Sequence, residues 1–429
     1  MRRTSEAFIH HSSFRIHHFP VSFTLFFRVK LPVFYRHKVI NHRVTFYIMR
    51  LLALVPSVYD RNPSQRYRIE QWEPLLRARG VEITYKPFES KELNEVLYQP
   101  GRLPEKLCLV SKSLARRFAE MRAARGFDAV YILRETALLG PPVFERMLAR
   151  LRVPFIYDFD DAVFERYVSP SNGYLSYLKF PSKTRTICRL AAHVMAGNEY
   201  LADYARAVNE RVTVIPTTVD TEKYTVEPKA ESNPPVIGWT GSYSTVQHLR
   251  TLTGALRRLS ERERFRLRVI GAEGFSLEGL EGVEVEVLPW RSETEVSDLR
   301  PLDVGIMPLP EDRWSRGKCG MKALQYMGLA IPTVCSPVGV NSDIIRDGEN
   351  GFLAATEDEW VEKLARLLRS PELRARLGRA GRETVEARYS AAVQAPRVLQ
   401  IIESVVRPRA ATTQEGGAVS SPHRPVSHR

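Results

Sequence analysis

The chain has 429 residues, of which 44% are hydrophobic and 26% are charged, a composition typical of globular proteins with about two or three domains at this length. No apolar run reaches the roughly 18 residues that a membrane helix needs, and the four cysteines form no CxxC pair, which favours reduced thiols in a cytoplasmic protein over a disulfide framework. The net charge of +14 is uneven, because residues 1–48 hold eight Arg or Lys and one Glu.

Residues 1–48 show neither a helical nor a strand period, whereas residues 49–56 form an apolar stretch behind an initiator-like Met49. We therefore expect translation to start at Met49 and residues 1–48 to be a non-native or disordered extension. A signal peptide is not expected, since no small-residue cleavage site follows the apolar run in this segment. A disordered tail is expected at 407–429, which is rich in Pro, Ser, Gly and Arg.

Between these ends, short apolar strands alternate with helical patterns, an order that predicts α/β domains with parallel sheets covered by helices. The first six predicted strands are 51–56, 81–86, 129–133, 155–158, 193–196 and 212–215. The next six are 236–239, 267–270, 283–288, 304–308, 333–335 and a short one around Phe352. Polar residues replace the apolar strands around 220–235. We therefore predict two tandem Rossmann-like domains, at 49–222 and 235–388.

Ligands of such sheets bind beyond the carboxyl ends of the strands. The predicted strand at 236–239 leads into a glycine turn and a helix start. Gly241 would let a ligand approach the backbone, and Ser242, Ser244 and Thr245 would offer hydroxyl groups at the helix N-terminus. The alternative is an ordinary turn with an N-cap residue.

A second helix start is predicted at Gly320. Lys318 and Lys322 are four residues apart, so on one helix they would lie on the same face and add two positive charges. With the partial positive charge of the helix N-terminus, they predict a diphosphate site. The alternative is a basic helix start that faces solvent. Two helix N-termini that can bind an anion, both in one domain, favour a binding site for a nucleotide diphosphate.

Five segments of the second domain, in this order, resemble those of glycosyltransferase family 4, which has the two-domain GT-B fold. They are residues 238–242, 303–309, 318–327, 336–341 and 347–353. In the first domain, residues 64–68 and 157–162 resemble a bacterial branch of that family. The resemblance covers about residues 49–405. It implies two Rossmann-like domains whose parallel sheets face each other across a cleft, and a terminal helix at 389–406 that crosses back to the first domain.

The resemblance implies a glycosyltransferase that binds a nucleotide diphosphate sugar on its second domain and the acceptor on its first, and that retains the anomeric configuration. The donor-binding residues would be Gly241, Ser242, Thr245, Gly320 and Gln325. Preorganised helix N-termini and lysines stabilise a departing diphosphate without a metal. No metal and no cofactor are therefore expected, apart from the nucleotide sugar as co-substrate.

The chain departs from the family pattern at two positions. Many members carry two glutamates eight residues apart around the donor sugar and the ribose, where this chain has Gly317 and Gln325. Gln325 would still bond a ribose hydroxyl, although more weakly than a carboxylate does. Gly317 has no side chain, so Lys318, Arg316 or the backbone would serve the sugar.

Three acids, Asp158, Asp160 and Asp161, lie within four residues at the end of a predicted strand of the first domain. One interpretation is a metal-binding DxD motif, and another is the nucleophile motif of haloacid-dehalogenase phosphatases, but the second Rossmann-like half argues against both. The resemblance would place this loop near the donor sugar, with Asp160 and Asp161 as catalytic residues beside Lys318 and Lys322. A structural interpretation makes one Asp a helix cap.

Two arginines after the first strand, Arg66 and Arg68, would face the cleft from the acceptor side, unless they are ordinary solvated charges. The acceptor is left open as a glycan, a lipid-linked molecule or a protein, and no nucleic acid is expected. The second functional hypothesis is a catalytically inactive nucleotide-sugar-binding or scaffold protein, because both family glutamates are missing.

A membrane contact is a further expectation. Several relatives act on lipid-linked acceptors at the cytoplasmic leaflet, and a basic face of the first domain would bind an anionic membrane reversibly. The residues of this face are Arg116, Arg117, Arg122, Arg125, Arg146, Arg150 and Arg152. The alternative is a basic face that only contacts solvent.

Overall fold

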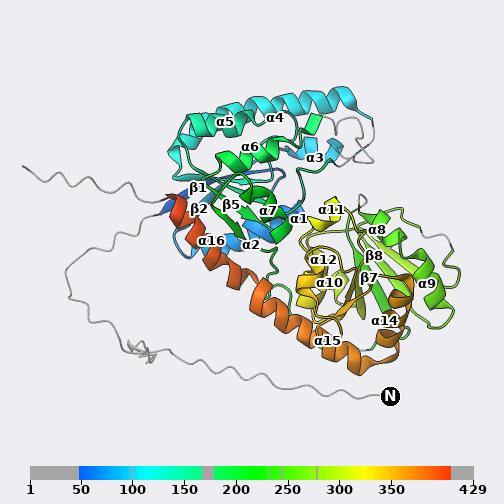
Figure 1. The fold of residues 1–429 in the computed structure, drawn as a ribbon. Coiled ribbons are helices and arrows are strands. Elements are labelled where there is room, and N and C mark those ends of the chain that lie inside the picture. Colours follow the sequence, from blue (N-terminus) through cyan, green and yellow to red (C-terminus); the bar gives the residue numbers. More distant parts are fainter. Residues whose placement is uncertain are drawn as a thin grey trace, which may run out of the picture. The chain divides into compact units, whose positions relative to one another are not determined.

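The computed structural model describes residues 48–406, apart from 98, 100, 167–177, 230, 243–244 and 277–278. The expected extension up to residue 47, the expected tail 407–429 and Ser244 lie outside the described residues. Within the described part, two six-stranded sheets form the centres of two α/β domains (Figure 1). The prediction of two tandem Rossmann-like domains is thereby confirmed.

The first sheet has the strand order β2-β1-β3-β4-β5-β6, and all its neighbouring strands are parallel. Its strands are β1 (Met49–Val55), β2 (Val81–Pro87), β3 (Ala129–Leu133), β4 (Phe155–Phe159), β5 (His193–Ala196) and β6 (Val212–Val214). All six predicted strands of the first half are present. The chain reverses its direction across the sheet between β1 and β3, and ligands of such sheets bind at the carboxyl ends of the strands that flank this point.

The second sheet has the order β12-β11-β10-β7-β8-β9, again with parallel neighbours. Its strands are β7 (Val236–Thr240), β8 (Arg266–Ile270), β9 (Glu284–Leu288), β10 (Val304–Met307), β11 (Thr333–Cys335) and β12 (Phe352–Leu353). This is the order of the dinucleotide-binding Rossmann fold. Its switch point lies between β7 and β10, so the turn after β7 is where a ligand is expected.

Helices cover both sheets. Those of the first domain are α1 (Pro63–Gln65), a π-helical segment (Arg66–Glu70), α2 (Gln71–Arg77), α3 (Lys91–Leu97), α4 (Leu103–Ala123), a 3-10 turn (Ala124–Gly126), α5 (Val143–Arg150), α6 (Lys183–Leu190) and α7 (Glu199–Arg206). Those of the second domain are α8 (Val246–Arg250), α9 (Thr253–Ser260), α10 (Glu295–Leu299), α11 (Arg313–Arg316), α12 (Met321–Gly328), α13 (Asn341–Ile344), α14 (Glu357–Arg369), α15 (Pro371–Thr384) and a second π-helical segment (Val385–Tyr389). None of the helices in the described ranges is long and apolar enough to cross a membrane.

The last helix, α16 (Ala391–Val406), packs on the first domain. Figure 1 shows it in red beside α2. Val398 and Ile402 of α16 join one apolar cluster with Leu51 of β1 and Trp72 of α2. The neighbouring residues Leu52 and Leu54 of β1 belong to a different cluster, which includes helices α3 to α7. Successive residues of β1 thus point to opposite faces of the sheet, and each face is covered by helices.

Candidate functional site

A tight loop leads into helix α12 beyond the carboxyl end of β10 in the second sheet. Gly320 is the N-cap residue of α12, with a φ of 70°. A Cβ atom at this position would lie 2.3 Å from Cδ1 of Ile344, so both the backbone conformation and the space require glycine. Because Gly320 has no side chain, the first turn of α12 has no side-chain cap, and its backbone N–H groups are available to an anion.

Lys318 and Lys322 do not share a helical face, and that prediction is wrong. Lys318 lies in the loop before α12, and its Nζ donates to Oδ1 of Asp161 at 2.8 Å. Lys322 lies in the first turn, with its Nζ 5.5 Å from the ring centre of Trp239. Among the described residues it has no hydrogen bond or ion pair. Burial, followed by repulsion from Lys318, lowers its pKa to about 8.

The turn after β7 approaches the same tryptophan. A Cβ atom on Gly241 would lie 2.4 Å from Cη2 of Trp239, so the turn packs directly on the indole ring that faces Lys322. The amide of Ser242 donates to Oγ1 of Thr245 at 3.1 Å, and this hydroxyl donates back to the carbonyl oxygen of Ser242. The Thr245 hydroxyl therefore stabilises the turn, and the helix that follows, α8, has only five residues.

A histidine adds to the chemistry of this region. His248 is 9% exposed, and burial together with the charges of Lys322 and Lys318 lowers its pKa to about 4. His248 is therefore neutral at neutral pH, because a third positive charge would be repelled by the two lysines. A neutral imidazole offers one donor and one acceptor beside these cations.

Asp158, the first of the three acids, is a structural residue. Its carboxylate is fully buried and pairs with Arg68, whose Nε lies 2.6 Å from Oδ2, and it also accepts from the hydroxyl of Tyr131. Burial raises the pKa of Asp158, and the charge of Arg68 opposes that shift. Neither Asp158 nor Arg68 is accessible to a metal or an acceptor. The prediction that Arg68 faces a cleft is therefore wrong.

The other two acids are held by Arg134, which follows β3 at the switch point of the first sheet. Nε of Arg134 donates to Oδ1 of Asp160 at 2.8 Å, and its NH2 group pairs with Asp161. Burial alone would raise the pKa of Asp160, but the charge and hydrogen bonds of Arg134 outweigh it and hold the pKa below its usual value. The Asp160 carboxylate is therefore ionised. Asp161 connects Arg134 of the first domain with Lys318 of the second.

Backbone contacts hold the loop before α12 against the first domain. Sγ of Cys319 lies 3.2 Å from the carbonyl oxygen of Asp160. Nδ2 of Asn198 donates to the carbonyl oxygens of Arg316 and Lys318 at 3.2 and 3.0 Å. A Cβ atom on Gly317 would lie 2.7 Å from the amide nitrogen of Ala162. A glutamate at position 317 would clash with this backbone, which explains why the chain has glycine there.

A buried polar cluster forms a second contact between the domains. Arg66 donates to both carboxylate oxygens of Glu295, at 2.9 and 2.6 Å. Nε2 of Gln325 lies 2.6 Å from the hydroxyl of Tyr67, 3.0 Å from that of Tyr224 and 3.3 Å from Oε1 of Glu295. Arg66 is 5% exposed and its guanidinium pairs across the domain contact, so it does not face an open acceptor side as predicted.

Gln325 is 2% exposed, and its Oε1 has no hydrogen-bond partner among the described residues. The structure thus places Gln325 beside the carboxylate of Glu295, which lies on α10. The family pattern would instead place its two glutamates at positions 317 and 325. In this conformation Tyr67 and Tyr224 occupy the donors of the Gln325 amide. The free oxygen of Gln325 is buried as well, so a ribose hydroxyl would reach Gln325 only after a change of this conformation.

The structure brings together Lys318, Lys322, Asp161, Gly241 and Gly320, and places Gln325 and Arg66 in the separate cluster with Glu295. Sequence reasoning missed Arg134, Asn198, Trp239, His248 and Glu295. Arg134 and Asn198 each follow a buried strand, so the rule that ligands bind at the carboxyl ends of strands would have found them. Glu295 carries no comparable signal, since it lies on a five-residue helix.

The predicted basic face of the first domain is only partly present. Arg117 is buried and pairs with Glu120 at 2.8 Å, and Arg116 donates to the carbonyl oxygens of Pro87 and Phe88. These two arginines therefore stabilise the fold. The other five are exposed, and so are four apolar side chains of α4 and α5, namely Leu103, Leu107, Phe118 and Val143.

Comparison with known proteins gives a family for part of the chain. Residues 234–370 match the family model described as glycosyl transferases group 1. The second domain thus carries the signature of group 1 glycosyltransferases. EpsD of Bacillus subtilis, described as a glycosyltransferase, is 37% identical over 67 residues, which are 15% of this chain and 18% of EpsD. The chain therefore matches less than a fifth of that relative's length.

Solved structures resemble the whole described region. Sucrose-phosphate synthase from Thermosynechococcus elongatus has a TM-score of 0.61 at 16% identity, covering 83% of this chain and 99% of the synthase. HepE from Anabaena, in complex with UDP and glucose, has a TM-score of 0.60 at 17% identity, covering 83% and 100%. A glycosyltransferase from Rickettsia africae has a TM-score of 0.58 at 14% identity, covering 84% and 99%. At these identities the likeness shows the fold, which is of the GT-B type.

Proposed function

We propose that the protein is a glycosyltransferase that moves a sugar from a nucleotide diphosphate sugar to an acceptor, with retention of configuration and without an obligatory divalent metal. The observation that carries the proposal is Lys322, a cation with no anionic partner among the described residues, in the first turn of a helix whose N-terminus has no side-chain cap. Lys322 is half-buried, and a cation that is partly removed from water without an anionic partner is costly. A diphosphate would provide the missing charge.

The chemistry follows from this arrangement. As the bond between the sugar and the diphosphate breaks, negative charge develops on the departing phosphate oxygens. The N–H groups of α12 and the ammonium groups of Lys322 and Lys318 would stabilise that charge from fixed positions. The turn at Gly241, which packs on Trp239, would line the same diphosphate site. A front-face route needs no protein nucleophile. This agrees with the structure, because the carboxylates of Asp160 and Asp161 are already paired with Arg134 and Lys318.

UDP-linked sugars are the donors to test first, because HepE, which has the same fold, binds UDP and UDP-glucose. The proposed acceptor classes are still a glycan, a lipid-linked molecule and a protein. A cytoplasmic location is supported by four free cysteines, of which Cys108 is exposed.

The test is a thermal-shift screen of UDP, UDP-glucose, GDP-mannose and ADP-glucose, followed by measurement of nucleoside diphosphate release from the best nucleotide sugar with and without a chelator. A ligand at about 100 times its Kd should stabilise the protein by about 2.7 kcal/mol. Release of nucleotide diphosphate is expected to continue in chelator. No shift with any of the four nucleotides would contradict the proposal, and activity that vanishes in chelator and returns with magnesium or manganese would contradict its metal independence.

An inactive nucleotide-sugar-binding or scaffold protein is the second candidate function. The observation that favours it is the engagement of Gln325 by Tyr67 and Tyr224, together with the lack of a side chain at Gly317. Such a protein would give a thermal shift with a nucleotide sugar but would neither hydrolyse nor transfer it.

We also propose a peripheral contact with an anionic membrane through exposed residues of α4 and α5. Phe118 and Val143 are 48% and 40% exposed, and Arg122, Arg146 and Arg150 are exposed on the same two helices. Each basic residue near an anionic surface contributes about 1 kcal/mol. Cosedimentation with phosphatidylserine-containing vesicles at low salt is therefore expected, and a variant with Arg146→Glu and Arg150→Glu should bind at least about tenfold more weakly.

The matched control carries Arg376→Glu and Arg379→Glu, which change the same charge on exposed residues of α15. If both double variants bind equally, the contact is not on α4 and α5. If the unmodified protein does not bind anionic vesicles even at low salt, a soluble acceptor is favoured.

A further inference from the structure

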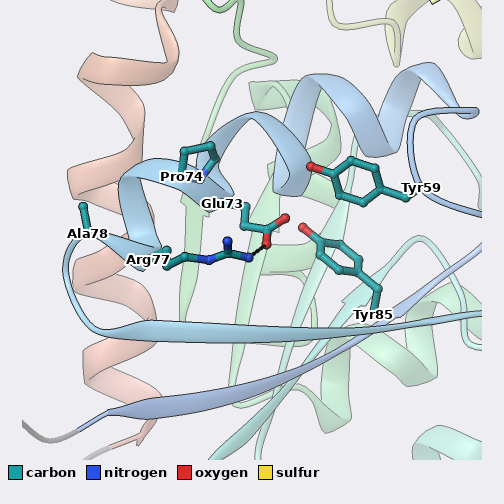
Figure 2. A pocket seen from close by; sticks show the side chains of 6 residues that line it. All are labelled: Tyr59, Glu73, Pro74, Arg77, Ala78 and Tyr85. Atoms are coloured by element: carbon teal, nitrogen blue, oxygen red, sulfur yellow. Dashed lines mark hydrogen bonds and ion pairs between the residues drawn. The ribbon is translucent and has the colours of Figure 1, made fainter.

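A groove lies between helix α2 and the edge strand β2 of the first domain. It has a volume of about 740 Å³ and is lined by Tyr59, Glu73, Pro74, Arg77, Ala78 and Tyr85. Figure 2 shows the two tyrosine rings on one side and the α2 residues on the other, with the phenol groups and the Arg77 guanidinium directed toward the Glu73 carboxylate. None of the contacts described for the donor site uses these side chains.

The two tyrosines form an aromatic pair. Their ring centres are 5.3 Å apart and the rings are nearly perpendicular, at 85°. Tyr59 is 54% exposed, although a tyrosine that serves only the core would be buried. Such a pair offers a rigid apolar surface with hydroxyl groups at its rim, the combination that suits a ligand with one apolar and one polar side.

The polar groups converge on one point. Glu73 forms an ion pair with Arg77 one helical turn later. The carboxylate also affects both phenols: burial and then the charge of Glu73 raise the pKa of Tyr59 to about 12. Both phenols therefore keep their protons at neutral pH. The groove thus presents hydroxyl donors, a guanidinium and a carboxylate acceptor within one small area, as sites for small polar ligands do.

The charge of the groove does not favour anionic ligands. Its lining holds one cation, Arg77, which is already balanced by Glu73. The next charged groups around Tyr59 are the acids Glu70 and Asp60, and Asp60 is paired with Arg66. A phosphate, a nucleotide or a uronic-acid polymer would find no unbalanced cation in this lining. A neutral ligand rich in hydroxyl groups needs none.

The groove lies close to the contact between the two domains. Tyr59 follows the carboxyl end of β1, and the next residue, Asp60, accepts hydrogen bonds from Arg66 and from Ser292 of the second domain. The groove therefore begins at the contact between the domains and runs outward along α2. A chain molecule whose end lies at the domain contact would have its following units here.

We propose that this groove binds a neutral oligosaccharide, with a sugar ring against Tyr59 and its hydroxyl groups bonded to Glu73 and Arg77. The binding itself is independent of catalysis, but its role as the outer part of an acceptor glycan rests on the proposed glycosyltransferase function. Among the three acceptor classes left open, it selects the glycan.

The experiment is calorimetric titration of the full chain, without nucleotide, with three neutral probes (maltohexaose, cellohexaose and mannohexaose) and one anionic probe (hexagalacturonate). At least one neutral hexasaccharide is expected to bind, and Tyr59→Ala should weaken its binding about tenfold because the stacking surface is lost. Tyr59→Phe keeps the ring and should retain most of the affinity. Glu73→Gln, which preserves shape but removes the charged acceptor, should weaken binding.

The matched control is Leu75→Ala, since Leu75 lies next to Pro74 on α2, is 40% exposed and does not line the groove. Its affinity for the oligosaccharide should equal that of the unmodified protein. The proposal is overturned if no neutral hexasaccharide binds, if Leu75→Ala weakens binding as much as Tyr59→Ala does, or if hexagalacturonate binds best. Thermal shifts with nucleotides test the donor site separately. Failure of oligosaccharide binding would therefore not contradict the proposed glycosyltransferase function, and absence of a nucleotide shift would not contradict the groove.

Discussion

Replacing Lys322 by alanine is expected to lower the rate of sugar transfer by about 10²–10³, the usual effect of removing one preorganised charge from a site where negative charge develops. Lys322 is the stronger of the two lysine candidates because its ammonium group contacts the face of Trp239 and has no anionic partner among the described residues. Lys318→Ala should also slow transfer, but part of its effect would come from the lost pair with Asp161. The measurement is steady-state release of the nucleotide diphosphate.

Lys363→Ala is the matched control, because Lys363 also lies over an aromatic ring, that of Phe352, but has an ion pair with Asp347 and belongs to α14. Its kcat/KM should be unchanged. Near-normal turnover in both Lys318→Ala and Lys322→Ala would rule out the diphosphate assignment.

The pH profile gives an independent readout of Lys322. Its pKa is lowered to about 8 in the unliganded protein, and only the protonated form attracts a diphosphate. The value of kcat/KM, which reports groups of the free enzyme, should therefore fall as the pH rises through about 8. Lys322→Arg should remove this fall, because arginine keeps its proton at any such pH. If kcat/KM of Lys322→Arg fell with rising pH as it does in the unmodified protein, the titration would belong to another group.

The sheets could be predicted from the sequence because their central strands are short, apolar and buried on both faces. All twelve predicted strands are present, and their ends differ by at most two residues. The apolar residues between 246 and 259 recur at steps of three and four, which predicts one continuous helix, but the structure has two helices, α8 and α9, separated near Leu252. The apolar period was correct there, since Val246, Leu249, Leu252, Leu256 and Leu259 are all buried, but periodicity does not reveal a local break.

The partners of the charged residues could not be predicted. Arg66 pairs with Glu295, 229 positions later, and Gln325 bonds Tyr67, 258 positions earlier. No local pattern contains these contacts, because they depend on how the two domains meet. The glycine at 317 shows the same limit: the sequence shows only a departure from the family pattern, whereas the structure shows that a Cβ atom there would lie 2.7 Å from the amide nitrogen of Ala162.

Breaking the pair of Arg68 and Asp158 is expected to have the largest effect on stability. Both side chains are completely buried, with NH2 of Arg68 2.6 Å from Oδ1 of Asp158. Arg68→Met would leave an unpaired carboxylate in the core of the first domain, which typically costs about 3–5 kcal/mol of unfolding free energy. Guanidinium chloride denaturation, followed by circular dichroism, measures this loss. Asp158→Leu should cost a similar amount, because it leaves the guanidinium unpaired.

The double variant Arg68→Met, Asp158→Leu decides whether the cost comes from the unpaired charge. It removes both charges, so it should be more stable than either single variant, although the hydroxyl of Tyr131 would lose its acceptor. Arg206→Met is the control: Arg206 forms exposed pairs with Glu199 and Asp203, and exposed pairs contribute about 0–1 kcal/mol. If Arg68→Met destabilised the protein no more than Arg206→Met does, the buried pair would have no special role in stability, and Asp158 would again become a candidate for a functional acid.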